Sequence, residues 1–191
     1  MKTSRAFTLV ETMIAITILT LAISGAFLAA NSSLLAAETS RDQLAASFLA
    51  QEGIEYLRAM RDDYYLSAYR TGGANVSSTA WSNFLSAAAP CRGSTCMLDP
   101  AQGMGVGPGL SLVSCSGANC LPLYRDANGY NEQNRGSKTP FTRTVRLADV
   151  SGAPVDPLGN PVDIRIVSTV SWSFHGVPYS VTASSHLTPW Q

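Results

Sequence analysis

The side chains best suited to chemistry in this sequence are four cysteines, which form two C-x4-C units. Cys91 and Cys96 enclose Arg-Gly-Ser-Thr, and Cys115 and Cys120 enclose Ser-Gly-Ala-Asn. Four thiolates at this spacing approximate a structural zinc site, whereas in an oxidising compartment disulfides are the default. Of the three possible pairings we favour the two local ones, because each unit holds glycine and small polar residues that turn tightly. The nested pairing, Cys91–Cys120 with Cys96–Cys115, is the second choice.

An oxygen-rich stretch is a weak candidate for a calcium site. Asp126, Asn128 and Glu132 would supply its carboxylate and amide oxygens. Asp-x-Asn-Gly is also common β-turn chemistry, and the EF-hand pattern with its distant glutamate is absent. We therefore expect a turn here, with calcium as the alternative.

Groups for catalysis are sparse. The two histidines, His175 and His186, have no cysteine or carboxylate cluster near them in the sequence, and no nucleophile stands beside a base. We expect no enzymatic activity and no cofactor. The tryptophans Trp81, Trp172 and Trp190 are expected in the core or over a sheet edge rather than on an adhesive surface.

Charge is distributed unevenly along the 191 residues. Only 14% of them are charged and the formal net charge is zero, which argues against a nucleic-acid partner. No charged residue lies between Glu11 and Glu38, and this stretch exceeds the roughly 20 residues needed to span a bilayer. Lys2 and Arg5 precede it, so the positive-inside rule predicts a cytoplasmic N-terminus and an extracytoplasmic C-terminal part. That location favours disulfides over zinc.

A cleavable signal peptide is the rival interpretation of this segment. Its apolar region is about 7–15 residues long and ends in small residues, such as Ala29-Ala30 or Ala36-Ala37. Helix-favouring sequence instead continues from Glu38 to Asp63, so we favour one helix from about Phe7 to Asp63. Glu11 then lies within the apolar segment, where a central charge costs about 2.5–3.5 kcal/mol on insertion scales and calls for a dedicated partner.

The residues around Glu11, Ser4-Arg-Ala-Phe-Thr-Leu-Val-Glu11, resemble the signature of type IV prepilins. The resemblance implies that an inner-membrane prepilin peptidase cuts between Ala6 and Phe7 and methylates the new amino group of Phe7. It also implies that Glu11 pairs with an α-ammonium group, its own or a neighbouring subunit's, and so sets the register of assembly. The family usually has glycine at the position of Ala6.

Two further features bear on the type of subunit. Major pilins commonly have a proline in the middle of the anchor, whereas this chain has Gly25 and no proline there. The stretch from Ala45 to Arg61 is similar to minor pilins of the pilus-modification group. Both features favour a minor pilin or a pseudopilin.

The rest of the chain predicts an α+β, pilin-like fold. Ala45, Leu49, Gly53, Tyr56 and Met60 share one helix face. Glycine-rich stretches at 70–79 and 101–109 indicate loops. Alternation at 141–150, 162–172 and 177–186 predicts an antiparallel sheet that covers the helix stripe. The expected organisation is a leader at 1–6, a transmembrane and filament-core half-helix at 7–37, an amphipathic half-helix at 38–64, a variable loop region with both C-x4-C units at 65–140, and a sheet at 141–191.

We accordingly expect a structural subunit of a type IV pilus or related filament, most consistent with a minor pilin. A pseudopilin of a type II secretion system or a competence pilin is the alternative, and a membrane-tethered adhesin or binding module is less favoured. The expected partners are other pilin subunits, the prepilin peptidase, the inner-membrane assembly platform and, before assembly, membrane lipid, with no nucleic acid. The protein would span the cytoplasmic membrane once, N-in and C-out, and then join an extracellular filament.

Overall fold

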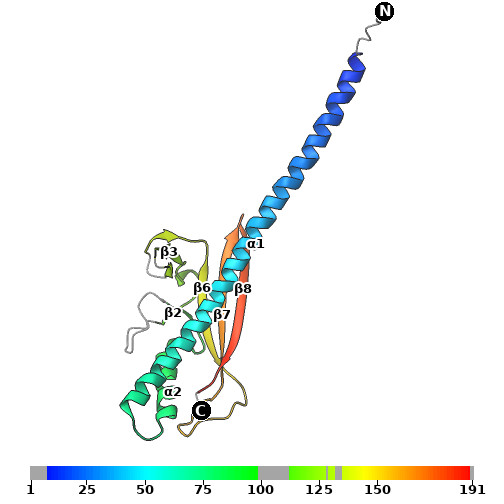
Figure 1. Cartoon of the computed structure of the whole chain (residues 1–191). Helices are drawn as coiled ribbons and strands as arrows, with labels where there is room; N and C mark the ends of the chain where they lie inside the picture. Colours follow the sequence, from blue (N-terminus) through cyan, green and yellow to red (C-terminus); the bar gives the residue numbers. More distant parts are fainter. Residues whose placement is uncertain (1–7, 99–111, 128, 132–134, 190–191) are drawn as a thin grey trace, which may run out of the picture. The chain divides into compact units, whose positions relative to one another are not determined.

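The structure is a computed structural model that describes residues 8–98, 112–127, 129–131 and 135–189. The chain divides into two units, Met1–Asp42 and Gln43–Gln191, which are described separately. Figure 1 shows the order of the elements along the chain. They are α1 Leu9–Thr71, α2 Val76–Ala87, the 3-10 turns η1 Ala89–Cys91 and η3 Gly117–Asn119, and the strands β1 Thr95–Met97, β2 Val113–Cys115, β3 Tyr124–Asp126, β4 Gly129–Asn131, β5 Ser137–Lys138, β6 Thr142–Asp149, β7 Ile164–Phe174 and β8 Val177–Leu187.

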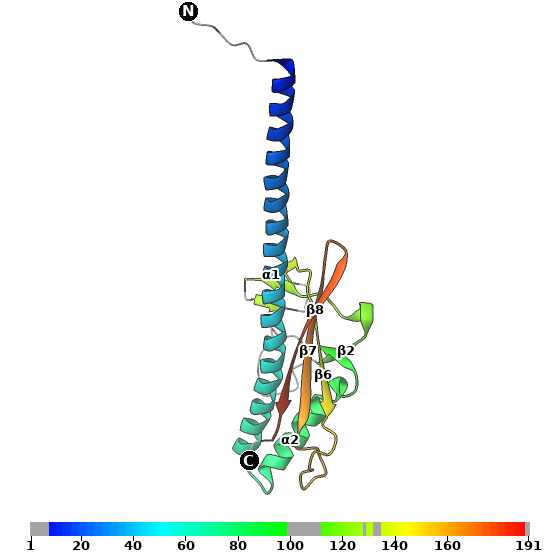
Figure 2. The same ribbon diagram turned by 90° about the vertical axis from the view of Figure 1, so that its right-hand side faces the viewer.

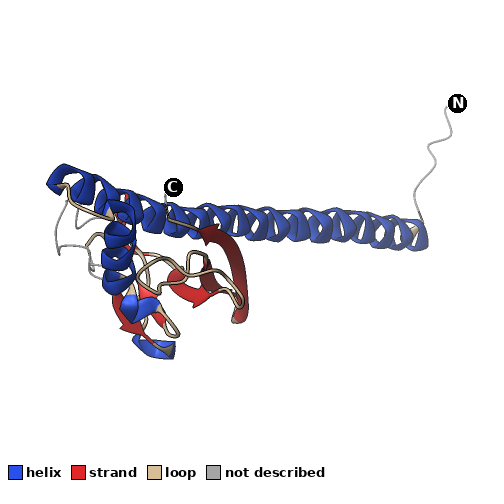
Figure 3. Ribbon diagram, turned by 90° about the horizontal axis from the view of Figure 1, so that it is seen from below, coloured by secondary structure: helices blue, strands red, loops and turns tan. Residues whose placement is uncertain are grey.

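In the second unit, α1 buries one face along its length. The predicted stripe is confirmed for four of its members, while Ala45 is only partly buried. The buried residues of α1 are Ala46, Leu49, Ala50, Gly53, Ile54, Tyr56, Leu57, Met60 and Tyr65. The strands of the larger sheet lie on one side of this helix, as Figure 3 shows.

The predicted end of the helix near Asp63 is wrong, because α1 continues to Thr71. Tyr65 is 3% exposed, so this extra length contributes to the core. The stop is the pair Gly72-Gly73: both have positive φ, and the N–H of Gly72 bonds to the carbonyl of Ala68 at 3.0 Å. A glycine in the left-handed conformation just beyond the last turn is a common helix terminator.

The predicted loop at 70–79 is wrong in its second half, where α2 begins at Val76. Trp81 and Phe84 of α2 are completely buried, with ring centroids 5.4 Å apart, and the Trp81 indole N–H donates to the carbonyl of Pro161 at 2.8 Å. Burial of these aromatic rings outweighs the weak helix propensity of the preceding Ser and Thr residues. In Figure 2, α2 lies beside the C-terminal end of α1.

The predicted antiparallel meander is confirmed by β6, β7 and β8. The five-stranded sheet has the order β2-β1-β6-β7-β8, and a smaller sheet has the order β4-β3-β5. The tight turn between β7 and β8 consists of His175 and Gly176, both with positive φ, as a two-residue hairpin turn requires. On β6 and β7 the buried residues alternate with outward-facing ones, which is the pattern of a sheet covered on one face.

The core has two parts along the contact between helix and sheet. One gathers Tyr56, Leu57 and Met60 of α1 with α2 and with Val145, Leu147, Ile164 and Ile166 of the sheet. The other gathers Ala46, Leu49 and Ala50 with Leu123, Phe141, Val170 and Trp172. Trp81 and Trp172 are therefore core residues, while Trp190 lies outside the described residues.

Helix and sheet lie close together at Gly53. A Cβ atom added there would lie 2.6 Å from the Ser168 Oγ and 3.3 Å from the Arg143 Cδ. Arg143 is fully buried, and its Nη1 donates to the Glu52 Oε2 at 2.6 Å. The gap between α1 and β7 has room for glycine here, because a Cβ atom would be too close to the Ser168 side chain.

Candidate functional site

The first candidate residue, Glu11, lies exposed in the first turn of α1. Its backbone N–H donates to the Thr8 Oγ1 at 3.3 Å, and the Thr12 N–H bonds to the Thr8 carbonyl at 3.2 Å. Thr8 is thus the N-cap, and Thr-Leu-Val-Glu has the spacing of a capping box. A carboxylate at this position is also favoured by the helix dipole. Sequence reasoning missed Thr8, although threonine three residues before a glutamate and an apolar run was the available signal.

The predicted cleavage and methylation site, Ala6 and Phe7, lies outside the described residues. Cleavage between them and methylation of Phe7 therefore stay predictions. The pairing of Glu11 with an α-ammonium group also stays a prediction.

The apolar half of α1 presents its large side chains to its surroundings. In the first unit, Leu9, Val10 and Phe27 are each more than 60% exposed. One helix is long and apolar enough to cross a membrane, judged by length and composition, and no side chain of its most apolar window is buried. No described residue of this chain covers these apolar side chains, so their cover has to come from other molecules.

The hydroxyl groups of this apolar segment form hydrogen bonds within the helix itself. Thr17 Oγ1 donates to the Met13 carbonyl at 2.6 Å, and Ser24 Oγ donates to the Thr20 carbonyl at 2.7 Å. Thr12, Thr20, Ser32 and Ser33 make equivalent bonds to carbonyls three or four residues earlier. A polar group without a partner is costly in hydrocarbon, so this arrangement makes a segment containing hydroxyls compatible with lipid.

The cysteines form two local disulfides. The structure links Cys91 to Cys96 and Cys115 to Cys120. Strands β1 and β2 pair Thr95 with Cys115, so the two loops lie side by side at one end of the larger sheet. Cys91 and Cys96 are completely buried. The disulfides therefore fix the shape of the segments that complete this end of the head.

The calcium candidate is only partly described. Asp126 ends β3 and pairs with Gly129 across a tight turn, and its Oδ2 accepts a hydrogen bond from the Asn131 Nδ2 at 3.3 Å. Asn128 and Glu132 lie outside the described residues. The calcium site therefore stays a prediction.

The histidines lie apart from one another. His175 is in the β7–β8 turn and packs edge-on against the Phe174 ring, at 4.4 Å between centroids. His186 is on β8, and its Nδ1 lies 2.9 Å from the Asp163 Oδ1. Among the described residues, no group of three or more His, Cys, Asp or Glu side chains could hold a metal ion.

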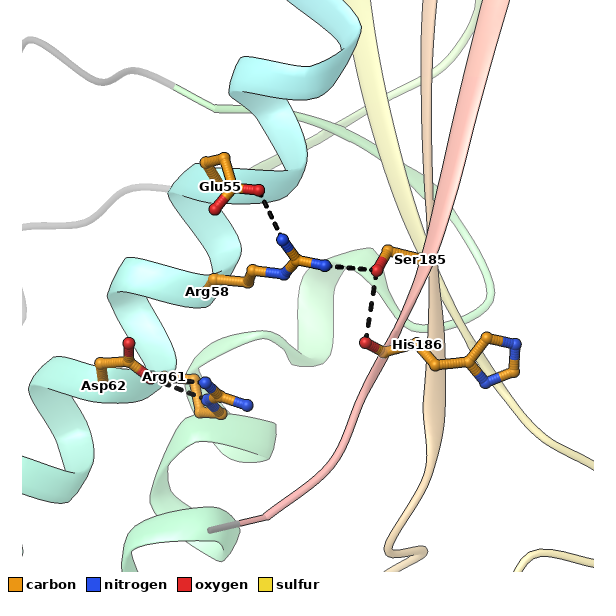
Figure 4. A network of polar contacts seen from close by, with 6 residues as sticks. All are labelled: Glu55, Arg58, Arg61, Asp62, Ser185 and His186. Atoms are coloured by element: carbon orange, nitrogen blue, oxygen red, sulfur yellow. Dashed lines mark hydrogen bonds and ion pairs between the residues drawn. The ribbon is translucent and has the colours of Figure 1, made fainter.

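A polar network fastens the edge strand β8 to α1 (Figure 4). The Arg58 Nη2 donates to the Ser185 Oγ at 2.6 Å, as Figure 4 shows. The Arg61 Nη1 donates to the Thr188 carbonyl at 3.0 Å. Both arginines also pair with carboxylates of their own helix, Glu55 and Asp62. The network ties the C-terminal end of β8, and the residue that follows it, to α1.

In a comparison with protein families, residues 1–27 match the prokaryotic N-terminal methylation motif. No curated protein and no solved structure matches the chain. The motif implies processing by a prepilin peptidase and assembly with other pilins, and it indicates a structural subunit. Together with the apolar helix it fits a membrane-anchored pilin. The chain thus carries the type IV prepilin signature on an α+β, pilin-like fold.

Proposed function

We propose that this chain is a minor pilin of a type IV pilus or related filament. In this proposal the prepilin peptidase cuts between Ala6 and Phe7 and methylates Phe7. The mature chain stays anchored in the cytoplasmic membrane, N-in and C-out, until the assembly platform inserts it into the filament. The observation that carries the proposal is the methylation motif at residues 1–27, which continues into a helix whose apolar side chains are exposed.

The two halves of α1 have different roles in this proposal. Residues 7–37 contact lipid before assembly and the helices of other subunits afterwards. Support comes from the large exposed side chains and the internally bonded hydroxyls of this segment. Residues 38–64 join the anchor to the head. Residues 65–140 form a variable region that holds two disulfides and adds β1 and β2 to the sheet, and residues 141–191 supply its strands β6, β7 and β8.

Glu11 has two roles under this proposal. Within its own chain it occupies the third position of a capped helix. Between chains its carboxylate pairs with the α-ammonium group of Phe7 in a neighbouring subunit. Both charged groups lose their contact with water, and this cost is offset only when the two groups pair. An incorrectly placed subunit would leave this charge unpaired, so the pair selects the correct register.

The N-terminal motif fits a pseudopilin of a type II secretion system or a competence pilin equally well. The absence of proline from the anchor and the disulfide-bearing head favour a minor pilin. A tethered adhesin is the third candidate.

Mass analysis of the N-terminus, in cells with and without the prepilin peptidase, tests the proposal. We expect a mature chain that begins at N-methylated Phe7 only when the peptidase is present. A chain that begins after Ala30 or Ala37, or that keeps Met1 beside an active peptidase, would show that the segment is not a prepilin leader.

The role of Glu11 has its own test, the substitution Glu11→Ala. Processing and membrane insertion should persist, while the amount of subunit in sheared filaments falls at least severalfold, because the unpaired α-ammonium group is costly in an apolar core. Glu38→Ala removes a carboxylate at the other end of the apolar segment and serves as the matched control. Thr8→Val removes the cap but keeps the charge, so normal incorporation of that variant would assign the effect to the charge. Normal incorporation of Glu11→Ala would refute the registry role.

A further inference from the structure

The sheet has a second face, which points away from α1. We call it the outer face: the residues of β6, β7 and β8 that alternate with the buried ones. The strand register arranges them in rows across the three strands. The rows are Thr142–Ser171–Ser180, Thr144–Thr169–Thr182, Arg146–Val167–Ser184 and Ala148–Arg165–His186.

Hydroxyl groups dominate one half of the outer face. The first two rows consist entirely of Ser and Thr, and the Oγ1 atoms of Thr169 and Thr182 lie 3.1 Å apart. Neighbouring strands are about 4.8 Å apart, so these rows form a regular field of hydrogen-bond donors and acceptors. The four rows contain no Phe, Tyr or Trp residue, and His186 is the aromatic ring that they do contain.

Positive charge gathers in the other half. Arg146 and Arg165 are exposed, and their side chains make no hydrogen bond or ion pair with any described residue. By contrast, Arg58, Arg61, Arg92 and Arg143 are each paired with a carboxylate. Arg165 lies directly opposite His186, whose ring contacts Asp163.

A hollow of about 580 Å³ adjoins the arginines. Arg92, Gly93, Arg146, Ala148 and Asp149 are among the residues that line it. The Arg92 Nη2 lies 2.8 Å from both carboxylate oxygens of Asp149, which holds this guanidinium in place at the rim. Ala148 is the register partner of Arg165, so a small side chain separates the hollow from the second unpaired arginine.

The chemistry of the outer face selects among anionic ligands. Guanidinium groups bind carboxylates through paired, charge-assisted hydrogen bonds, and serine and threonine hydroxyls match the hydroxyls of a sugar. Single-stranded nucleic acid would need several aromatic side chains for base stacking, whereas the rows supply the ring of His186 alone. The phosphate backbone of a duplex would need a wider basic surface. We propose that the outer face binds an acidic polysaccharide, with Arg146 and Arg165 holding its carboxylates and the Ser and Thr rows its hydroxyls.

Binding of oligogalacturonate to the purified full chain in detergent micelles tests this inference. Isothermal titration at low salt should detect binding of the polyuronate and none of a neutral galactan of the same length. The double variant Arg146→Gln/Arg165→Gln should weaken binding at least tenfold, because both carboxylate contacts are lost. Added salt should weaken binding to the unaltered protein, because exposed charges are screened.

The matched control is Arg70→Gln/Lys138→Gln, which removes the same charge from exposed positions away from the outer face. It should bind within twofold of the unaltered protein. Circular dichroism and intact disulfides would show that both variants are folded. The inference is overturned if the unaltered protein does not bind the polyuronate, if both double variants lose affinity equally, or if the neutral galactan binds equally well. Tighter binding of duplex DNA would also overturn it, in favour of a nucleic-acid ligand. These measurements need no filament, so they succeed or fail independently of the proposed role in assembly.

Discussion

The close contact at Gly53 makes an unusual prediction: replacing a glycine in the middle of a helix with alanine should destabilise the head. In an ordinary exposed helix this change stabilises by about 1 kcal/mol, because glycine is the more flexible residue. Here the new methyl group would lie 2.6 Å from the Ser168 Oγ and 3.3 Å from both the Arg143 Cδ and the Val145 Cγ1. Overpacking of this kind costs about 1–3 kcal/mol. With three contacts this close we take the upper value, which leaves a net loss of about 2 kcal/mol.

The structure also predicts how to restore the lost stability. Ser168 is completely buried, and its Oγ has no hydrogen-bond partner among the described residues. Ser168→Ala alone should therefore stabilise the head by about 1 kcal/mol, since a buried hydroxyl without a partner is costly. It also removes the atom that the Gly53→Ala methyl group would meet first. In the Ser168→Ala background, Gly53→Ala should cost at least about 1 kcal/mol less than in the unaltered protein.

Thermal unfolding of the full chain in detergent, followed by near-ultraviolet circular dichroism, measures these effects, because Trp81 and Trp172 are buried in the head. A loss of about 2 kcal/mol corresponds to a fall in Tm of about 4–8 °C for a domain of this size. The control is Gly25→Ala, because no atom lies within 4 Å of a Cβ at that position. If Gly53→Ala left the Tm unchanged or raised it, or if Ser168→Ala gave no rescue, the close contact between helix and sheet would be refuted.

Three further predictions concern the head. Glu52→Ala should lower its free energy of unfolding, measured with denaturant, by about 2–3 kcal/mol. The loss is smaller than for a fully buried pair because the Glu52 side chain is 45% exposed. Adding Arg143→Met to the same chain should recover part of the loss, because it removes the unpaired buried charge. When reductant is added stepwise, the Cys115–Cys120 disulfide should open before the Cys91–Cys96 disulfide, because Cys91 and Cys96 are fully buried. Mass spectrometry of alkylated peptides measures the order, and simultaneous opening would contradict it. Trp81→Phe should lower the free energy of unfolding by about 1–2 kcal/mol, through the loss of its buried hydrogen bond, and an unchanged value would show that this bond contributes nothing.

Sequence patterns predicted the parts of the fold that depend on regular periodicity. The stripe around Leu49 and Met60 has the period of a helix, and the strands β6 to β8 alternate with period two, so one buried face follows directly from each pattern. The predicted strand ends also lie within two residues of the observed ones.

The prediction failed where tertiary contacts decide the structure. Tyr65 extends α1 because its ring is buried in the core, and Trp81 draws a Ser- and Thr-rich segment into α2 for the same reason. Neither contact has a local signal. The Gly72-Gly73 stop and the Thr8 cap, by contrast, had recognisable local signals that the interpretation did not use.

The candidate functional residues show the same difference between local patterns and tertiary contacts. The motif around Glu11 is local and could be recognised from letters alone. The outer face brings together Arg146 of β6 and Arg165 of β7, and Arg92 lines the adjoining hollow, so the arrangement depends on strand register and could not be predicted from the sequence.

The internal hydrogen bonds of the apolar segment bear on how easily a subunit changes its surroundings. Thr17 and Ser24 form their bonds with the carbonyls of their own helix, so neither side chain has to exchange a partner when the medium around the helix changes. Moving such a helix between lipid tails and other apolar helices breaks none of these bonds. Under the proposed function, the equilibrium between the two environments is then governed by packing and by the pairing of the Glu11 carboxylate with an α-ammonium group. The hydroxyl groups of the helix would oppose such a transition in neither direction.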